Sequence, residues 1–285
     1  MRNDIHIVLD STAVMGQTLL KDDLRCHEVR LSVRHGRTEW RDGEKSLAEM
    51  FAMVEATGEL PKTSQPPLGD FLLLFKELAE QGKKILMIAI DGVLSGTVQT
   101  ARLAARQVME ELPGADIRVV DSLTTANAVS GMAMAILEYI DSGAEMDAVE
   151  DYANDLAQRT ETIFSVDTLT YLQKGGRIGA VGALVGNLLG IRPIVHLNKK
   201  GELTIADKVR TRSKTLRRML EIGSEFAPFE AMYIAHAEAP EDAENLKEHL
   251  MEMYPGVPIL VTGIGTVLAS HLGPKVIGVF LRRKK

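Results

Sequence analysis

The stretch KILMIAIDGVLSGTVQTARLAARQVMEEL, residues 84–112, decides the fold class of this chain. It opens with a short, mainly apolar run that is typical of a buried strand, and the residues after Thr97 repeat with the period of a helix. Two further apolar runs, IHIVLD at 5–10 and DIRVVDS at 116–122, end in polar turns, and a second helical pattern occupies residues 127–143. Strand, turn and helix in repetition predict a parallel α/β sheet.

The carboxyl ends of these three strands carry acidic and small polar residues. They are Asp10-Ser11-Thr12, Asp91-Gly92 and Asp121-Ser122. In open parallel sheets, ligands bind beyond the carboxyl ends of the strands. This edge is therefore the first place to look for a binding site.

The second half of the chain has a different pattern. Residues 191–210 predict a β-hairpin with its turn at Asn198–Gly201, and a basic amphipathic helix follows at 211–223. Another helix is expected at 240–254. Three more strands are expected at 231–237, 258–265 and 275–281. Mixed strand directions among so few helices predict an α+β domain.

The expected domains are an N-terminal α/β domain of residues 1–160 and a C-terminal α+β domain of residues 161–285. A polar segment near residues 28–49 predicts a hairpin or an excursion outside the parallel sheet. The glycine-rich segment AVGALVGNLLG, residues 180–190, predicts a helix of small residues. Its glycines, which follow Gly179, either allow close helix packing or leave a channel for an alkyl chain.

The composition narrows the function classes. The chain has 285 residues, 45% of them hydrophobic and 25% charged, which fits two ordinary globular domains. A net charge of −6 argues against a general nucleic-acid-binding face. One cysteine, Cys26, excludes an internal disulfide and a cysteine-rich zinc site. Because no signal peptide or run of about 20 apolar residues is visible, we expect a cytoplasmic protein without stable membrane insertion.

The first candidate site is TSQPP, residues 63–67. A Thr or Ser before a helix caps its first free amides, so Thr63 or Ser64 is expected to cap the following helix. The same helix start also offers amides and hydroxyls to an anion, and Gln65 adds an amide that capping does not require.

The second candidate site is LSGTVQTAR, residues 94–102, which follows a strand and opens a helix. Ser95, Gly96 and Thr97 place hydroxyls and a permissive glycine where amides could hold a carboxylate or phosphate. The segment lacks the Gly-Lys-Ser/Thr ending of a P-loop, so it does not predict nucleotide binding.

Two further candidates lie in the second half. Arg177 follows two glycines in KGGRIG and offers a fixed positive charge, unless it is an ordinary surface residue. His271, in GTVLASHLGPK, is expected in a loop before the last strand, where a structural hydrogen bond is the alternative to a functional one. No H-E-x-x-H or G-x-S-x-G pattern accompanies it, so neither a metal site nor an esterase triad is predicted.

Together, the candidate sites supply hydroxyls, amides, an arginine and a histidine, but no nucleophile–base pair. This combination favours holding an anionic head group over reacting with it. Apolar segments such as FLLLF, residues 71–75, stand nearby in the sequence and suit a hydrophobic tail.

In order and spacing, these motifs resemble the DegV family of bacterial fatty-acid-binding proteins. The matching pieces are DSTA at 10–13, TSQPP at 63–67, LSGTVQTA at 94–101, VVDS at 119–122, DTLTYLQKGGRI at 167–178, LLGIRPIV at 188–195, KVRTRSKTL at 208–216 and SHLGP at 270–274. The resemblance implies two α/β domains with a long-chain fatty acid, such as palmitate or oleate, buried in a tunnel between them. It implies no cofactor, no metal and no catalytic residue.

The resemblance also implies roles for single residues. Thr63 and Ser95 would hold the carboxylate, and Arg177 and His271 would support the head group or its presentation to a partner. Some members of the family serve as the acyl-binding subunit of a fatty-acid kinase, whose separate catalytic subunit phosphorylates the bound acid. The possible partner of this chain is therefore such a kinase subunit.

The chain departs from the family pattern at Asp91-Gly92, where serines are usual, at Ala269, where a glycine is common, and at Lys275, where Gly-Pro-Gly would end. An acidic side chain at position 91 would repel a carboxylate, unless strand alternation points it away. Two alternatives to a carrier stay open. One is an enzyme on a small phosphorylated or carboxylated metabolite, with Asp91 or His271 as acid–base group, and the other is a regulatory module that senses acyl chains.

Overall fold

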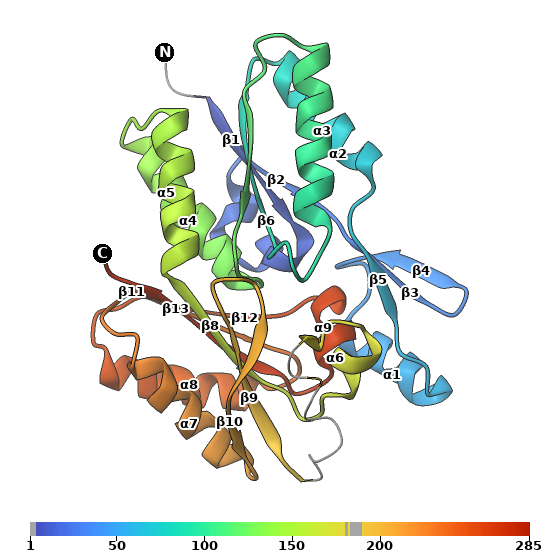
Figure 1. The fold of residues 1–285 in the computed structure, drawn as a ribbon, viewed down its shortest axis with the longest axis vertical. Helices are drawn as coiled ribbons and strands as arrows, with labels where there is room; N and C mark the ends of the chain where they lie inside the picture. The colour runs from blue at the N-terminus through green and yellow to red at the C-terminus, as the bar shows by residue number, and fades with distance from the viewer. Residues whose placement is uncertain (1–3, 180–181, 183–189) are drawn as a thin grey trace. The chain divides into compact units, whose positions relative to one another are not determined.

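The computed structural model describes residues 4–179, 182 and 190–285 (Figure 1). The strands are β1 Ile5–Asp10, β2 Cys26–Val29, β3 Ser32–His35, β4 Thr38–Arg41, β5 Lys62–Ser64, β6 Lys84–Ala89, β7 Ile117–Asp121, β8 Thr160–Ser165, β9 Arg192–Leu197, β10 Leu203–Val209, β11 Phe229–His236, β12 Ile259–Gly263 and β13 Ile277–Arg283. The helices are α1 Leu47–Thr57, α2 Leu68–Glu80, α3 Thr97–Glu111, α4 Asn127–Asp141, α5 Met146–Arg159, α6 Thr170–Lys174, α7 Arg212–Ser224, α8 Pro240–Met253 and α9 Thr266–Leu272.

The first sheet is parallel and has the strand order β2-β1-β6-β7. Along β1, Ile5, Ile7 and Leu9 face a core formed with α4 and α5, whereas Val8 belongs to the core formed with α2 and α3. Because helices cover both faces, all six residues of β1 are buried instead of alternating with exposed ones. The predicted parallel α/β/α domain is confirmed.

The second sheet is mixed and has the strand order β10-β9-β8-β13-β11-β12. Only β11 and β12 pair in parallel; the other neighbours are antiparallel. Helices α7 and α8 contribute Met219 and Leu246 to a core with Ile163, Ile234 and Val279 from the strands. The predicted hairpin is present as β9 and β10, and the predicted mixed sheet is confirmed.

A small sheet of order β4-β3-β5 contains the hairpin that was predicted within residues 28–49. The prediction was wrong for Glu28 and Val29, which belong to β2 of the parallel sheet. Because β2 is an edge strand with three half-buried residues, its apolar signal is too weak to stand out in the sequence.

Contacts divide the chain into two compact units. The first contains residues 1–32 and 64–158, and the second contains residues 33–63 and 159–285. The hairpin segment is thus grouped with the second unit, although it precedes most of the first in sequence. The domain boundary expected between residues 160 and 161 stays a prediction. The helix expected at 180–190 lies outside the described residues, apart from Gly182 and Gly190.

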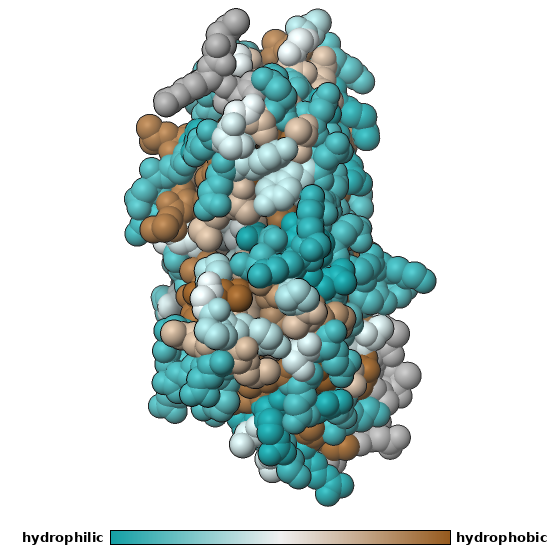
Figure 2. Space-filling model, turned by 90° about the vertical axis from the view of Figure 1, so that its left-hand side faces the viewer, coloured by the Kyte–Doolittle hydropathy of each residue, from teal (hydrophilic) through white to brown (hydrophobic). Residues whose placement is uncertain are grey.

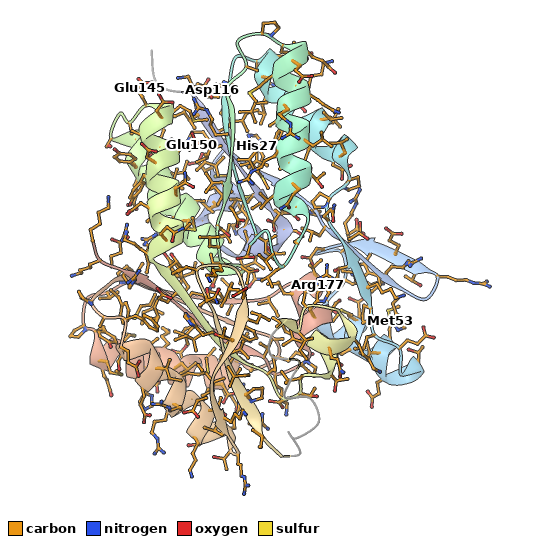
Figure 3. All side chains as sticks on the ribbon, viewed as in Figure 1. His27, Met53, Asp116, Glu145, Glu150 and Arg177 are labelled. Carbon is orange, nitrogen blue, oxygen red and sulfur yellow. The ribbon has the colours of Figure 1, made fainter. Side chains whose placement is uncertain are left out.

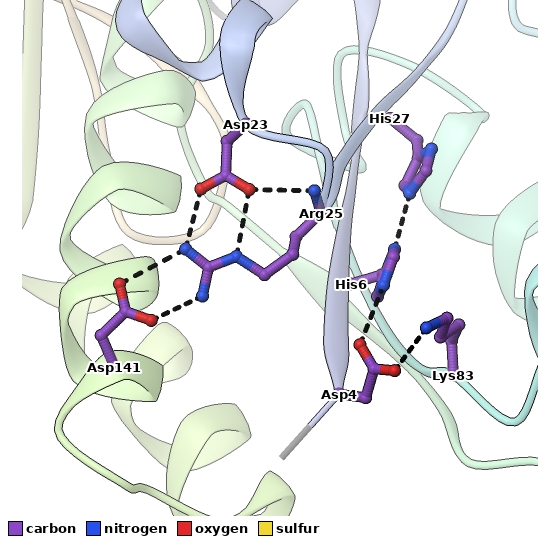
Figure 4. Close-up of polar contacts among 7 residues, drawn as sticks. All are labelled: Asp4, His6, Asp23, Arg25, His27, Lys83 and Asp141. Atoms are coloured by element: carbon purple, nitrogen blue, oxygen red, sulfur yellow. Dashed lines mark hydrogen bonds and ion pairs between the residues drawn. The ribbon is translucent and has the colours of Figure 1, made fainter. Parts of the chain in front are cut away.

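The amino-terminal edge of the parallel sheet carries a chain of polar contacts (Figure 4). His6 Nδ1 lies 2.8 Å from His27 Nε2, and His6 Nε2 lies 3.2 Å from Asp4 Oδ1. The Asp4 carboxylate accepts from His6 Nε2–H, so Nδ1 is the acceptor and His27 donates to it. Burial lowers the pKa of both imidazoles. Both rings are therefore held in the neutral form near pH 7.

The outer surface is mainly hydrophilic on the face drawn in Figure 2, where brown hydrophobic residues form small separate groups. Among the described residues, no helix has both the length and the apolar character needed to cross a bilayer.

Candidate functional site

Thr63 and His271 meet although 208 positions separate them. Thr63 Oγ1, on β5, lies 2.7 Å from His271 Nε2. His271 lies in the last turn of α9, so its expected placement in a loop was wrong. Residues 266–270 are all buried, so this short helix is covered on every side, and Gly273 ends it with a φ of 78°.

The environment of His271 keeps its imidazole neutral. Burial lowers the pKa of His271 to about 4, and the Arg177 cation adds to the shift. The ring is therefore uncharged near pH 7, and its Nδ1 atom is buried without a hydrogen-bond partner among the described residues. A neutral imidazole can donate from one nitrogen only, so its tautomer decides what Thr63 can do.

Gly175, just after α6, makes room for this ring. A Cβ atom at position 175 would lie 2.4 Å from His271 Nδ1 and 2.9 Å from the Tyr171 carbonyl oxygen. Gly273 is similarly close to Tyr171, because a Cβ there would lie 2.8 Å from the ring. The two glycines thus let α6 and α9 pack closely around His271.

Residues of the polar hairpin hold the start of α9. Asp42 Oδ1 accepts from Thr266 Oγ1 at 2.9 Å and from the Val267 amide at 3.2 Å. Trp40 Nε1 donates to Thr266 Oγ1 at 3.1 Å. Sequence reasoning missed these residues. An aspartate in a polar segment gives no signal that it will bind a helix start more than 220 positions away.

An open pocket of about 640 Å³ lies against this group. It is lined by residues 58–63, 174, 175, 177 and 271. Its cations are Lys62, Lys174 and Arg177, and its acidic residue is Glu59. Arg177, which follows α6 (Figure 3), donates from Nη1 to the Gly175 carbonyl at 2.8 Å. The pocket therefore presents positive charge close to Thr63 and suits an anion.

The expected helix cap was wrong for both Thr63 and Ser64. These residues end β5, and α2 begins at Leu68 with Pro67 as its N-cap and no side-chain cap. The two prolines lack N–H groups and hold the chain extended, so the helix begins beyond reach of either hydroxyl.

Gln65 lies against the start of α3. Its Nε2 atom donates to Thr100 Oγ1 at 3.1 Å, and a Cβ at position 96 would lie 2.7 Å from Gln65 Oε1. A side chain at position 96 would displace the exposed Gln65 amide from this place. The contact holds Gln65 against the start of α3.

Around Ser95, hydroxyls are paired with each other. Ser95 Oγ lies 2.8 Å from Thr97 Oγ1 and accepts from the Thr97 amide at 3.3 Å. The amides of residues 92, 93 and 94 donate to the carboxylates of Asp121 and Asp91. Within residues 94–102, the Leu94 amide donates to the Asp91 carboxylate, the Ser95 amide to the Asp91 carbonyl and the Thr97 amide to Ser95 Oγ. Anion binding by this segment stays a prediction.

The contacts join the predicted residues into two groups. Thr63, Arg177 and His271 surround the pocket of the second compact unit, and Gln65, Ser95, Gly96 and Thr97 surround the start of α3 in the first. Ser64 is exposed and follows Thr63 directly in the chain. No cluster of three or more metal-ligating residues occurs in the described part of the chain.

Comparison with known proteins places these motifs in a family. The family model described as "Uncharacterised protein, DegV family" matches residues 4–284. The chain belongs to the DegV family. Protein DegV of Bacillus subtilis is 31% identical to it over 284 residues, covering 97% of this chain and 98% of that protein. A DegV domain-containing protein of Listeria innocua is 32% identical, with 98% of both chains covered.

Solved DegV structures have the same fold. The structure described as fatty-acid binding of a DegV family protein from Thermus thermophilus has 31% identity and a TM-score of 0.88, with 99% of both chains covered. The structure of DegV from Bacillus subtilis, described as a fatty-acid-binding protein, has 27% identity and a TM-score of 0.84, with 98% and 99% covered.

Proposed function

We propose that this DegV protein binds one long-chain fatty acid, such as palmitate or oleate, and carries it or presents it to a kinase subunit without reacting with it. The carboxylate is held by the hydroxyls of Thr63 and Ser95, and the acyl chain lies in a tunnel between the two domains. Relatives that are described as fatty-acid-binding proteins support the ligand class.

The single observation that carries the proposal is the short contact between Thr63 and His271. A threonine hydroxyl has one proton. If His271 donates from Nε2, that proton is left for the ligand, and Thr63 becomes a directed donor to a carboxylate. The unpartnered Nδ1 fits this tautomer, because an acceptor lone pair left alone is easier to tolerate than an orphaned N–H.

Most of the binding free energy comes from the tail. Each hydrogen bond to a charged carboxylate is worth about 1.5–3 kcal/mol. Burial of fourteen methylenes at ~0.8 kcal/mol each offers on the order of 11 kcal/mol before ordering costs. The head-group bonds therefore set orientation, and the tunnel sets the chain length.

The cations of the pocket beside Thr63 suit the presentation role. Lys62, Lys174 and Arg177 could stabilise an acyl phosphate or an acidic surface of a kinase subunit. The low pKa of His271 disfavours the alternative in which this residue is the general base of an enzyme near pH 7. The cytoplasmic location expected from the sequence stays a prediction.

Mass spectrometry of the purified protein, native and after organic extraction, tests the ligand class. A carrier releases a fatty acid in near-stoichiometric amount or takes up added palmitate, whereas an empty protein that takes up none would contradict the proposal.

Variants then test the head-group site. Thr63→Ala with Ser95→Ala is expected to weaken palmitate binding by at least about 140-fold, from two lost bonds. Thr63→Ser with Ser95→Thr, which keeps both hydroxyls, is the matched control. Equal affinity of the alanine variant and the wild type, at equal thermal stability, would rule out this carboxylate site.

A further inference from the structure

Asp91 stands at the carboxyl end of β6 and is fully buried. Its Oδ1 atom accepts from the Val93 amide at 2.8 Å and from the Leu94 amide at 3.2 Å. Its backbone carbonyl accepts from the Ser95 amide at 3.1 Å. Asp91 therefore shapes the turn that carries Ser95, one of the two proposed carboxylate-binding hydroxyls.

The charge of this side chain is poorly compensated. Its Oδ2 atom is buried and has no hydrogen-bond partner among the described residues. The neighbouring charged groups are also acidic, since Asp121 accepts from the Gly92 amide and Asp10 accepts from the Ile90 amide. Within the described chain no lysine or arginine pairs with Asp91. An ionised Asp91 would thus stand unpaired beside any anion at Ser95.

We propose that Asp91 couples fatty-acid binding to proton uptake, so that Asp91 and the bound carboxyl group together carry one negative charge. The inference rests on the proposed function and adds a determinant of specificity to it. The proton goes to Asp91 Oδ2 or to the ligand carboxyl, and solvent supplies it. A ligand with a neutral head group, such as a long-chain alcohol, needs no such proton.

The surroundings of Asp91 favour the protonated form of its carboxyl group. Burial raises the pKa of Asp91, and the Asp121 carboxylate raises it further. A second negative charge on a ligand at Ser95 would repel the Asp91 carboxylate at the low effective dielectric of a protein site, which disfavours ionisation of both groups at once. Affinity is therefore expected to fall as the pH rises above the pKa of Asp91.

Isothermal titration calorimetry of palmitate into the full chain, in two buffers with different ionisation enthalpies, measures the coupling. Measured at several values between pH 6 and pH 8.5, the wild type is expected to take up as much as one proton per ligand. Asp91→Asn keeps the acceptor for Val93 and Leu94 but removes the charge, and it is expected to take up none. Glu80→Gln, an exposed change of the same charge, is the control and should match the wild type.

The outcomes separate this inference from the proposed function. Binding of palmitate with no proton uptake by the wild type anywhere in this pH range overturns the coupling and leaves fatty-acid binding intact. Uptake that is equal in the wild type and Asp91→Asn also overturns it. Absence of palmitate binding at every pH overturns the proposed function and the coupling together.

Discussion

The substitution Gly175→Ala tests the packing that holds His271. The added Cβ would lie 2.4 Å from His271 Nδ1, whereas an ordinary contact is 3.4–4 Å. The imidazole must therefore retreat by about 1 Å or more. A ring that moves toward Thr63 Oγ1 comes too close to this hydroxyl. A ring that moves sideways lengthens the 2.7 Å hydrogen bond between His271 Nε2 and Thr63 Oγ1 beyond hydrogen-bond range.

Either movement has a cost that can be bounded. Overpacking of a buried site costs about 1–3 kcal/mol, and loss of the bond between Thr63 and His271 costs about 0.5–1.5 kcal/mol more. The thermal midpoint of the second unit is expected to fall by roughly 2–4 °C per kcal/mol. Palmitate affinity is expected to fall about tenfold, because the Thr63 hydroxyl loses the partner that orients it.

The assay is thermal unfolding together with palmitate titration, with Gly69→Ala as the control. Gly69 lies inside α2, and an added Cβ there meets nothing within 4 Å. The control is expected to keep affinity and to gain up to about 1 kcal/mol from helix propensity. A Gly175→Ala protein with the stability and the palmitate affinity of the wild type would refute this reasoning.

Three further predictions concern polar groups. Asp42→Ala is expected to lower the free energy of unfolding by about 1.5–3 kcal/mol, because Thr266 and the start of α9 lose a buried charged acceptor; urea unfolding measures it, and an unchanged midpoint would contradict it. The imidazole of His271, observed by NMR, is expected to stay neutral from pH 8 to pH 6 and to titrate at about pH 4; a transition near its ordinary 6.5 would show that the burial is not as described. The pKa values of His6 and His27 are lowered in the folded protein, so the unfolded chain binds more protons below pH 6.5 and the free energy of unfolding decreases as the pH falls. The double variant His6→Asn with His27→Asn is expected to lose less stability between pH 7 and pH 5.5 than the wild type. An equally steep loss of stability in the variant would exclude this pair as the source.

Local patterns in the sequence determined most of the secondary structure. The apolar runs at 5–10 and 84–90 contain the central strands β1 and β6, which are mainly apolar because both of their faces are buried, and the run at 116–122 contains the edge strand β7, whose Ile117, Val119 and Val120 keep it recognisable. The weakest element, β2, was missed because an edge strand needs fewer apolar residues. The short α9 was missed because seven residues are too few for a helical period to emerge.

The motifs also identified the family and named Thr63, Ser95, Arg177 and His271 as residues of interest. They did not reveal how these residues are used. Thr63 was expected to cap α2, but two prolines carry the chain past that position and leave its hydroxyl to His271.

Only the tertiary structure decided which polar groups meet. The bond between Thr63 and His271 spans 208 positions, and that between Thr266 and Asp42 spans 224. It also showed that Asp91 Oδ1 accepts hydrogen bonds from two amides, whereas Asp91 Oδ2 is buried and has no hydrogen-bond partner among the described residues. Propensity and periodicity act over a few residues, whereas these contacts and burials follow from the packing of distant segments, which no local pattern encodes.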